Sequence, residues 1–174
     1  VHLLLTPEKA NNVSGFMQYV GRHYVPYINH KYGRSGTLWE GRFKASLVDS
    51  EAYLINIMRY IESCPLREKM VVSPSEYRWS SFKHNTGQLV ILVVNEHPVF
   101  TGLGETIEMA RLWYMRAFKT QLDAATVKKI TAAWLTGTPI GSDKFKAKVE
   151  EVVGRRVGLA RKGPPKKRET CMEL

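Results

Sequence analysis

Apolar residues recur at helical spacing along two stretches in the first half of the chain. Residues 12–32 form the first stretch, whose apolar face carries Phe16, Val20, Tyr24 and Tyr27 and which Gly33 ends as a C-cap. Residues 50–63 form the second stretch. Asp49 supplies an N-cap side chain there, and Pro65 disfavours helical geometry in the residue before it. The pattern therefore predicts two helices with a loop between them.

Three further helices are predicted in the second half of the chain, at residues 105–120, 123–135 and 142–153. A turn rich in Thr, Gly and Pro at residues 136–141 joins the last two. Two helices connected in this way are either a DNA-reading helix-turn-helix or an ordinary helical hairpin, and the pattern leaves both open.

Short apolar runs indicate strands at residues 1–5 and 43–48. Pro7 ends the first run because proline cannot donate to a ladder, and alternation of apolar and polar residues indicates the second. Residues 89–94 form another short apolar run, which is a strand or a loop. The pattern thus predicts a mixture of helices and strands.

The chain is strongly basic. Its 174 residues hold 26 Lys and Arg against 16 Asp and Glu, which gives a net charge of +10. An excess of this size favours a polyanionic partner such as nucleic acid, the alternative being a merely soluble basic protein.

Residues 154–168 carry basic charge without an acidic residue. Two prolines and three glycines argue that this segment is an arm and not a packed element. An uninterrupted run of like charge favours phosphate binding over an ordinary solvated tail. The basic residues of the arm are Arg155, Arg156, Arg161, Lys162, Lys166, Lys167 and Arg168.

Cysteine content and hydropathy indicate the compartment. Cys64 and Cys171 fit neither a disulfide framework nor a zinc pattern, so a reducing cytoplasm is expected. No apolar run approaches the roughly 18 residues that span a bilayer, so no membrane partner is expected.

Tyr60, on the second predicted helix, is a candidate nucleophile. It shares a face with Tyr53, Ile57 and Cys64, so Tyr60 and Cys64 are expected to point toward one site. A tyrosine that attacks a DNA phosphate needs a cation to neutralise the phosphate oxygens, and His2 and Cys64 are candidate ligands for it. The alternatives are a half-buried structural tyrosine, a structural or solvent-facing histidine and a cysteine packed at a helix end.

Aromatic and basic residues after the first predicted helix are candidate nucleic-acid contacts. Trp39 and Phe43 would stack on unpaired bases while Arg34, Arg42 and Lys44 hold the backbone. Equally, the two rings could belong to the core and the three cations to a solvated face.

Four blocks of sequence, in this order, resemble the REP-associated tyrosine transposases, a group of the HUH-type single-tyrosine transposases similar to those of insertion sequence 200. The blocks are Val-His-Leu-Leu-Leu-Thr-Pro at 1–7, Arg-Ser-Gly-Thr-Leu-Trp-Glu-Gly-Arg-Phe at 34–43, Met-Arg-Tyr-Ile-Glu at 58–62 and Tyr-Arg-Trp-Ser-Ser at 77–81. The similarity runs from residue 1 through Gly-Arg-Arg-Val at 154–157 and the basic arm, and so covers most of the chain.

The resemblance implies binding of single-stranded DNA folded into imperfect hairpins, and cleavage that leaves a 5′-phosphotyrosine link and a free 3′-hydroxyl. Tyr60 matches the attacking tyrosine by position. The family also holds a divalent metal, magnesium or manganese, with a His-hydrophobic-His pair on a strand and a polar side chain four residues after the tyrosine. His2 matches the second histidine of the pair, and the first histidine would stand before Val1. Cys64 stands where the family usually has asparagine. A thiolate suits magnesium poorly.

The residues expected to bind DNA are basic or aromatic: Arg22, Arg34, Trp39, Arg42, Phe43, Lys44, Arg155, Arg156, Arg161, Lys162, Lys166 and Lys167.

The fold implied by the resemblance is α+β, with a ferredoxin-like antiparallel sheet that carries His2, helices packed on that sheet, and a C-terminal helical pair with a basic tail. Residues 1–88 would form the transposase domain without its N-terminal portion. Residues 89–153 would form the helical region, with either a helix-turn-helix or a helical hairpin, and residues 154–174 the tail. Because the family's fold has strands and a helix upstream of the histidine pair, a second chain, as in a homodimer, would cover the sheet edge. The expected location is the nucleoid in a bacterial cytoplasm.

Two other functions stay open. One is a truncated relative that binds hairpin DNA without cutting it. The other is a basic RNA-binding protein that uses Trp39, Phe43 and the tail.

Overall fold

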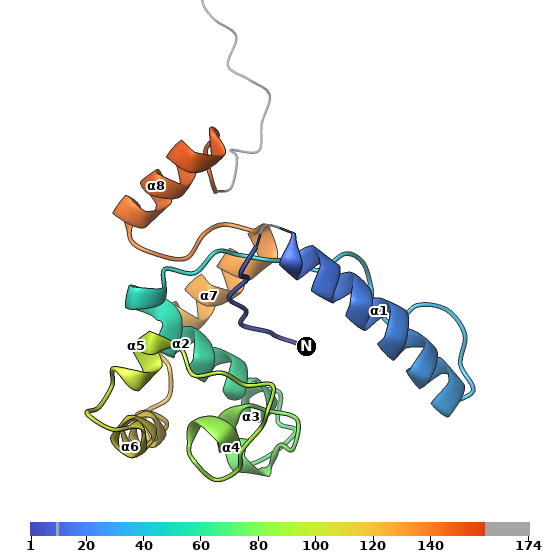
Figure 1. Cartoon of the computed structure of the whole chain (residues 1–174), viewed down its shortest axis with the longest axis horizontal. Helices are drawn as coiled ribbons and strands as arrows, with labels where there is room; N and C mark the ends of the chain where they lie inside the picture. Colours follow the sequence, from blue (N-terminus) through green and yellow to red (C-terminus); the bar gives the residue numbers. More distant parts are fainter. Residues whose placement is uncertain (10, 159–174) are drawn as a thin grey trace, which may run out of the picture.

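The computed structural model describes residues 1–9 and 11–158. Within these ranges the chain forms eight α-helices and one short 3-10 helix (Figure 1). They are α1 (Asn12–Lys31), α2 (Ser50–Glu62), α3 (Cys64–Arg67), η1 (Pro74–Glu76), α4 (Phe82–Asn85), α5 (Pro98–Thr101), α6 (Ile107–Ala117), α7 (Ala124–Thr136) and α8 (Asp143–Val153).

The predicted ferredoxin-like antiparallel sheet is wrong, because the described residues contain no sheet. Residues 1–5 and 89–94 pair with no other segment in that part of the chain, and residues 43–48 contribute only one isolated parallel bridge, between Val48 and Ile140. An apolar run becomes a strand only when another segment completes its ladder. Without such partners, Leu3 and Leu92 lie exposed.

The long predicted helices are confirmed. α1 begins at Asn12 as expected, and Gly33 follows its end with a left-handed φ of 60°. α2 begins after Asp49 and ends at Glu62, just before Pro65 enters the first turn of α3. α6 and α8 lie within the C-terminal stretches predicted from periodicity, and α7 extends one residue beyond its stretch, to Thr136.

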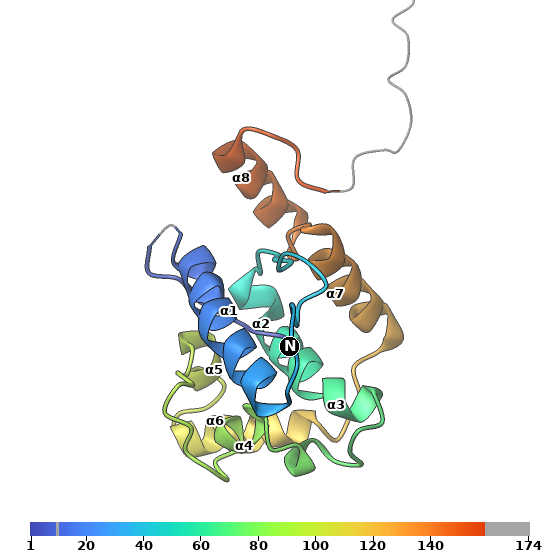
Figure 2. The same cartoon turned by 90° about the vertical axis from the view of Figure 1, so that its right-hand side faces the viewer.

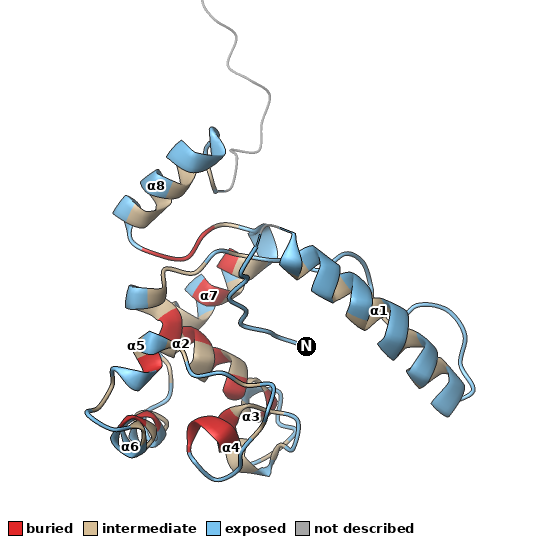
Figure 3. Ribbon diagram, in the orientation of Figure 1, coloured by how far each residue is buried: buried red, intermediate tan, exposed pale blue. Residues whose placement is uncertain are grey.

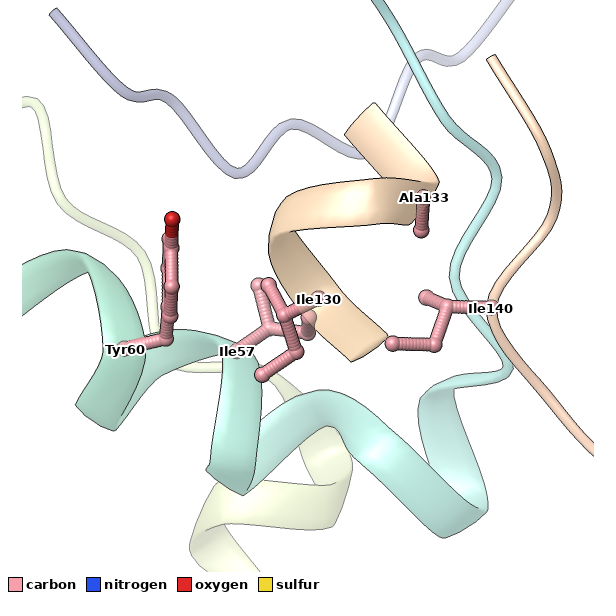
Figure 4. Close-up of a cluster of buried hydrophobic side chains, with 5 residues drawn as sticks. All are labelled: Ile57, Tyr60, Ile130, Ala133 and Ile140. Carbon is pink, nitrogen blue, oxygen red and sulfur yellow. The ribbon is translucent and has the colours of Figure 1, made fainter. Parts of the chain in front are cut away.

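α2 is the centre of the molecule, since it packs against α3, α5 and α7 (Figures 1 and 2). Two buried clusters form around it (Figure 3). One cluster joins Ile57 and Tyr60 of α2 to Ile130 and Ala133 of α7, and to Ile140 (Figure 4). The other gathers Phe100, Ala110 and Tyr114 from α5 and α6, with Ile55 and Met58 of α2 packed against it.

The segment between α7 and α8 ties the C-terminal helices to the start of α2. Asp49 N–H donates to Ile140 O and Ile140 N–H donates to Leu47 O, each over 2.8 Å. Ser142, the N-cap of α8, also donates to the Asp49 carboxylate. These bonds fix α7 beside α2.

α1 differs from the other long helices because it extends to one side of the molecule (Figures 1 and 2). All 20 of its residues are described and none is buried. Across the described residues, no helix combines the length and apolar character that a bilayer span requires.

Candidate active site

Tyr60 lies at the edge of the cluster between α2 and α7. Its side chain stands beside Ile57, one turn earlier on α2, and beside Ile130 of α7 (Figure 4). Only 5% of Tyr60 is exposed, so α7 and the neighbouring side chains cover it almost completely.

Two side chains of α7 hold the Tyr60 hydroxyl. It shares a hydrogen bond of 3.0 Å with the Thr131 hydroxyl, and it accepts a bond of 3.2 Å from the indole N–H of Trp134. Thr131 and Trp134 are three residues apart, so both reach the same side of α7. The phenolic oxygen is therefore fully engaged in this arrangement.

His2 lies beside Tyr60 although it does not lie on a strand. Its ring centroid is 5.8 Å from that of Tyr60 and 5.3 Å from that of Trp134, with the rings nearly perpendicular in both pairs. Residues 1–5 are coil, so these ring contacts position the imidazole in place of a sheet.

Arg67 and Cys64 also contact Tyr60. The guanidinium carbon of Arg67 is 4.2 Å from the Tyr60 ring centroid. The same guanidinium donates to the Tyr60 carbonyl over 2.9 Å and to the Cys64 sulfur over 2.8 Å. The Cys64 thiol donates to the Tyr60 carbonyl over 3.3 Å. Cys64 thus contacts the backbone of Tyr60, whereas the Tyr60 hydroxyl bonds to α7, and the convergence of the two side chains on one site stays a prediction.

The surroundings of the site keep His2 and Cys64 neutral. Partial burial lowers the pKa of His2, and the positive charge of Arg67 lowers it further. Burial raises the pKa of the Cys64 thiol more than the charge of Arg67 lowers it. His2 is therefore available as a neutral base, whereas Cys64 is a thiol and not a thiolate.

This donor set does not fit magnesium or manganese. Both ions prefer oxygen ligands, whereas His2 offers one imidazole nitrogen and Cys64 a protonated sulfur that already accepts from Arg67. In the part of the chain that the structure describes, no three His, Cys, Asp or Glu side chains are grouped to hold a metal. The divalent metal stays a prediction from the resemblance.

The predicted DNA-binding residues are spread over the surface. Lys44 lies nearest to Tyr60, with its ammonium 5.9 Å from the Trp134 ring. Trp39 is half-buried and stacks on Tyr24 of α1 at 6.3 Å, and Phe43 is exposed. The basic residues Arg22, Arg34, Arg42, Arg155 and Arg156 are also exposed. Arg161, Lys162, Lys166 and Lys167 lie outside the described residues.

Three residues of the site were missed by the sequence analysis: Arg67, Thr131 and Trp134. Arg67 follows Tyr60 by seven positions, so helical spacing continued through Pro65 would have placed it on the same face. Thr131 and Trp134 carried no comparable signal, because they reach Tyr60 only through the packing of α7 on α2.

Comparison of the chain with protein-family models, curated proteins and solved structures finds no match. The resemblance to the REP-associated tyrosine transposases therefore rests on the four sequence blocks alone.

Proposed function

We propose that this chain is a transposase-like protein that binds single-stranded hairpin DNA and cleaves and rejoins it through Tyr60. The observation that carries the proposal is the meeting of His2 and Tyr60. These residues come from two separate blocks of the resemblance, and their rings lie 5.8 Å apart in a fold that lacks the expected sheet. Arg67 and Lys44 add positive charge around them.

The proposed reaction is a transesterification. The phenolic oxygen of Tyr60 attacks the phosphorus and forms a new P–O bond, while its proton passes to a base. The bond between phosphorus and the 3′ oxygen breaks, and that oxygen keeps the electron pair and takes up a proton. Neutral His2, whose ring centroid lies 5.8 Å from that of Tyr60, is the proposed base, and the guanidinium of Arg67 offsets the negative charge of the phosphate.

Attack requires the Tyr60 hydroxyl to leave its two partners on α7. Thr131 and Trp134 hold this oxygen, and Tyr60 is only 5% exposed. Both contacts are neutral hydrogen bonds, each with a net contribution of about 1 kcal/mol. DNA that binds beside α7 can therefore displace them at modest cost.

A covalent adduct with hairpin DNA tests the proposal. The hairpin is labelled at its 3′ end, because a 5′-phosphotyrosine link leaves the downstream fragment on the protein. The wild-type chain, incubated with manganese or magnesium, should give a labelled band that survives denaturing electrophoresis. Tyr60→Phe should give none.

Tyr53→Phe is the matched control, since Tyr53 lies on the same face of α2 and its hydroxyl accepts from Lys129. This variant should form the adduct at the wild-type level. An adduct of equal strength in Tyr60→Phe would rule out Tyr60 as the nucleophile.

A second candidate function is hairpin binding without cleavage, which the incomplete metal donor set favours. Cys64→Asn separates the two candidates, because it supplies the amide oxygen that the family places at this position. A chain that cleaves should form more adduct in this variant when manganese is present. A chain that only binds should retain the hairpin without metal and form no adduct with either residue at position 64.

A further inference from the structure

α1 carries a row of exposed aromatic rings that the Tyr60 site does not use. Phe16, Tyr19, His23 and Tyr27 follow each other at intervals of three or four residues, so they share one face; we call this row the α1 stripe. Tyr19 is 64% exposed and Tyr27 is 55% exposed. The stripe extends over roughly 16 Å, at about 1.5 Å for each helical residue.

The loop after α1 covers a different part of the helix. Asn29 donates to Gly36 O over 2.8 Å, and Trp39 stacks on Tyr24 and lies close to Gly21. The stripe is left open beside this contact. Within it the ring centroids of Tyr19 and His23 lie 4.2 Å apart with the rings tilted by 43°, so two neighbouring rings of the stripe already contact each other.

The charge around the stripe has one sign. No acidic residue occurs between Glu8 and Glu40, whereas Arg22, Lys31 and Arg34 lie on or just after α1. The ammonium of Lys31 lies 5.7 Å from the Tyr27 ring and 5.5 Å from the Tyr32 ring. Cations thus accompany the aromatic rings along the helix.

We infer that the α1 stripe is a stacking platform for unpaired nucleotides. Aromatic rings combined with basic side chains are the combination that holds single strands, since bases stack on the rings while the cations meet the phosphates. The stripe matches about four stacked nucleotides at about 3.4 Å each. This inference rests on the proposed nucleic-acid function, but it does not depend on cleavage by Tyr60.

A polyanion fits this face better than a second copy of the chain. A protein with a net charge of +10 repels its own copies, and an interface usually excludes unpaired charge from its centre. The stripe lies among basic residues with no carboxylate nearby in sequence, so a docked copy would have to supply the missing negative charge. A nucleic-acid backbone supplies it at every nucleotide.

Fluorescence anisotropy with two hairpins tests the inference. One hairpin is blunt, and the other carries an unpaired flank of about eight nucleotides, within the range of about 4–16 that single-strand sites cover. Tyr19→Leu combined with Tyr27→Leu keeps apolar bulk and helix propensity but removes two rings. This double variant should lose at least about tenfold in affinity for the flanked hairpin and almost nothing for the blunt one.

Two controls identify stacking as the cause. Tyr19→Phe combined with Tyr27→Phe keeps both rings and should bind the flanked hairpin as the wild type does. Trp113→Leu removes a ring of similar exposure from α6 and should also leave binding unchanged. 2-Aminopurine in the flank should lose fluorescence when the wild type binds, and lose less with the leucine variant.

Unchanged affinity of the leucine variant for the flanked hairpin would overturn the inference. If that variant also became monomeric while the wild type sedimented as a dimer, the stripe would be a contact between copies. A wild-type chain that bound neither hairpin nor a matched RNA would overturn both proposals. A third result would reject only the proposed cleavage by Tyr60 and keep the inference about the stripe. In that result the wild type binds the flanked hairpin, the leucine variant binds it more weakly, and no variant forms an adduct.

Discussion

Tyr60 and Tyr114 are both buried tyrosines beside the same central helix, and their hydroxyl groups meet opposite surroundings. Tyr114 of α6 has no exposed surface and donates to the Glu62 carboxylate over 2.8 Å. Glu62 also accepts from Ser81 over 2.6 Å and from Asn85 over 2.7 Å. Tyr60 is held by two neutral groups of α7, beside the cation of Arg67.

The difference distinguishes a tyrosine fixed by a carboxylate from the tyrosine that we propose as the nucleophile. Burial and the neighbouring carboxylate raise the pKa of Tyr114 well above its ordinary value, so this phenol stays protonated and serves as a fixed donor. Among the described residues the Tyr60 oxygen bonds to no carboxylate, and in the proposed reaction a phosphate replaces its two hydrogen-bond partners. The burial of a tyrosine therefore says less about its role than the charge beside its oxygen.

Arg67→Met should produce the largest effect, a drop of about 100-fold in the rate of adduct formation, which is typical for the loss of one group that stabilises developing negative charge. The rate is measured by single-turnover assay with the 3′-labelled hairpin. Arg67→Lys should recover part of the rate because it keeps the charge. Arg59→Met is the control, because Arg59 also lies near the site on α2 but donates to Ala117 O and not to Tyr60. This variant should leave the rate near the wild-type value. Equal rates in Arg67→Met and Arg59→Met would contradict the role of Arg67.

Tyr114→Phe should leave the adduct unchanged and lower the free energy of unfolding by about 2 kcal/mol, because the buried Glu62 carboxylate loses one of its three donors. Urea denaturation measures the loss. Tyr53→Phe is the comparison, since that hydroxyl is not buried and its removal should cost little. If Tyr114→Phe were as stable as Tyr53→Phe, the bond from Tyr114 to Glu62 would not be the structural contact that distinguishes Tyr114 from Tyr60.

Trp134→Phe should raise the adduct rate by about fivefold, because it removes one neutral hydrogen bond of about 1 kcal/mol from the Tyr60 oxygen and keeps an aromatic ring in place. The labelled-hairpin assay gives the rate, and anisotropy confirms that affinity for the hairpin has not changed. A slower variant would mean that the indole N–H assists the reaction.

The smallest expected effect is a dependence of stability on pH that Glu62 causes. Burial raises the pKa of Glu62 despite its three donors, so the folded state binds this proton more tightly than the unfolded state does. The group therefore favours folding most below its unfolded pKa of about 4.3, and this contribution falls as the pH rises toward the raised folded value.

Glu62→Gln cannot titrate and serves as the reference for this effect. The free energy of unfolding of the wild type, measured relative to that of Glu62→Gln, should increase as the pH is lowered from neutral toward about 4.3, by about 1.4 kcal/mol for each unit by which the pKa is raised. A difference that stays constant over this interval would show that the burial of Glu62 does not affect its protonation.

The helices could be predicted because the signals that define them are local. Asp49 and Pro65 lie within a few residues of the two ends of α2, and Gly33 lies just after α1. Cys64 also packs against the cluster that contains Tyr60, as expected for residues four apart on a helix.

The sheet could not be judged from the sequence, because a strand depends on a distant partner. Residues 1–5 and 43–48 have the apolar character of strands, but only Val48 finds a pairing, and it pairs with Ile140. The burial of Tyr60 could not be predicted for the same reason, because Trp134, which bonds to its hydroxyl, lies more than 70 positions away in the sequence. His2 was assigned to the site by resemblance, and ring contacts place it there without the strand that was expected to carry it.

The backbone contacts of residues 46–49 with residues 138–142 have a consequence for the order of folding. Ser46 donates to Thr138 O across 92 positions, and the Val48–Ile140 bridge closes a loop of the same size. Closing so long a loop costs conformational entropy before the contacts it forms can stabilise the chain, so this step is slow compared with the formation of a helix. On the ribosome α2 emerges well before α7, so newly made chains present Tyr60 uncovered until residues up to Ile140 have been added.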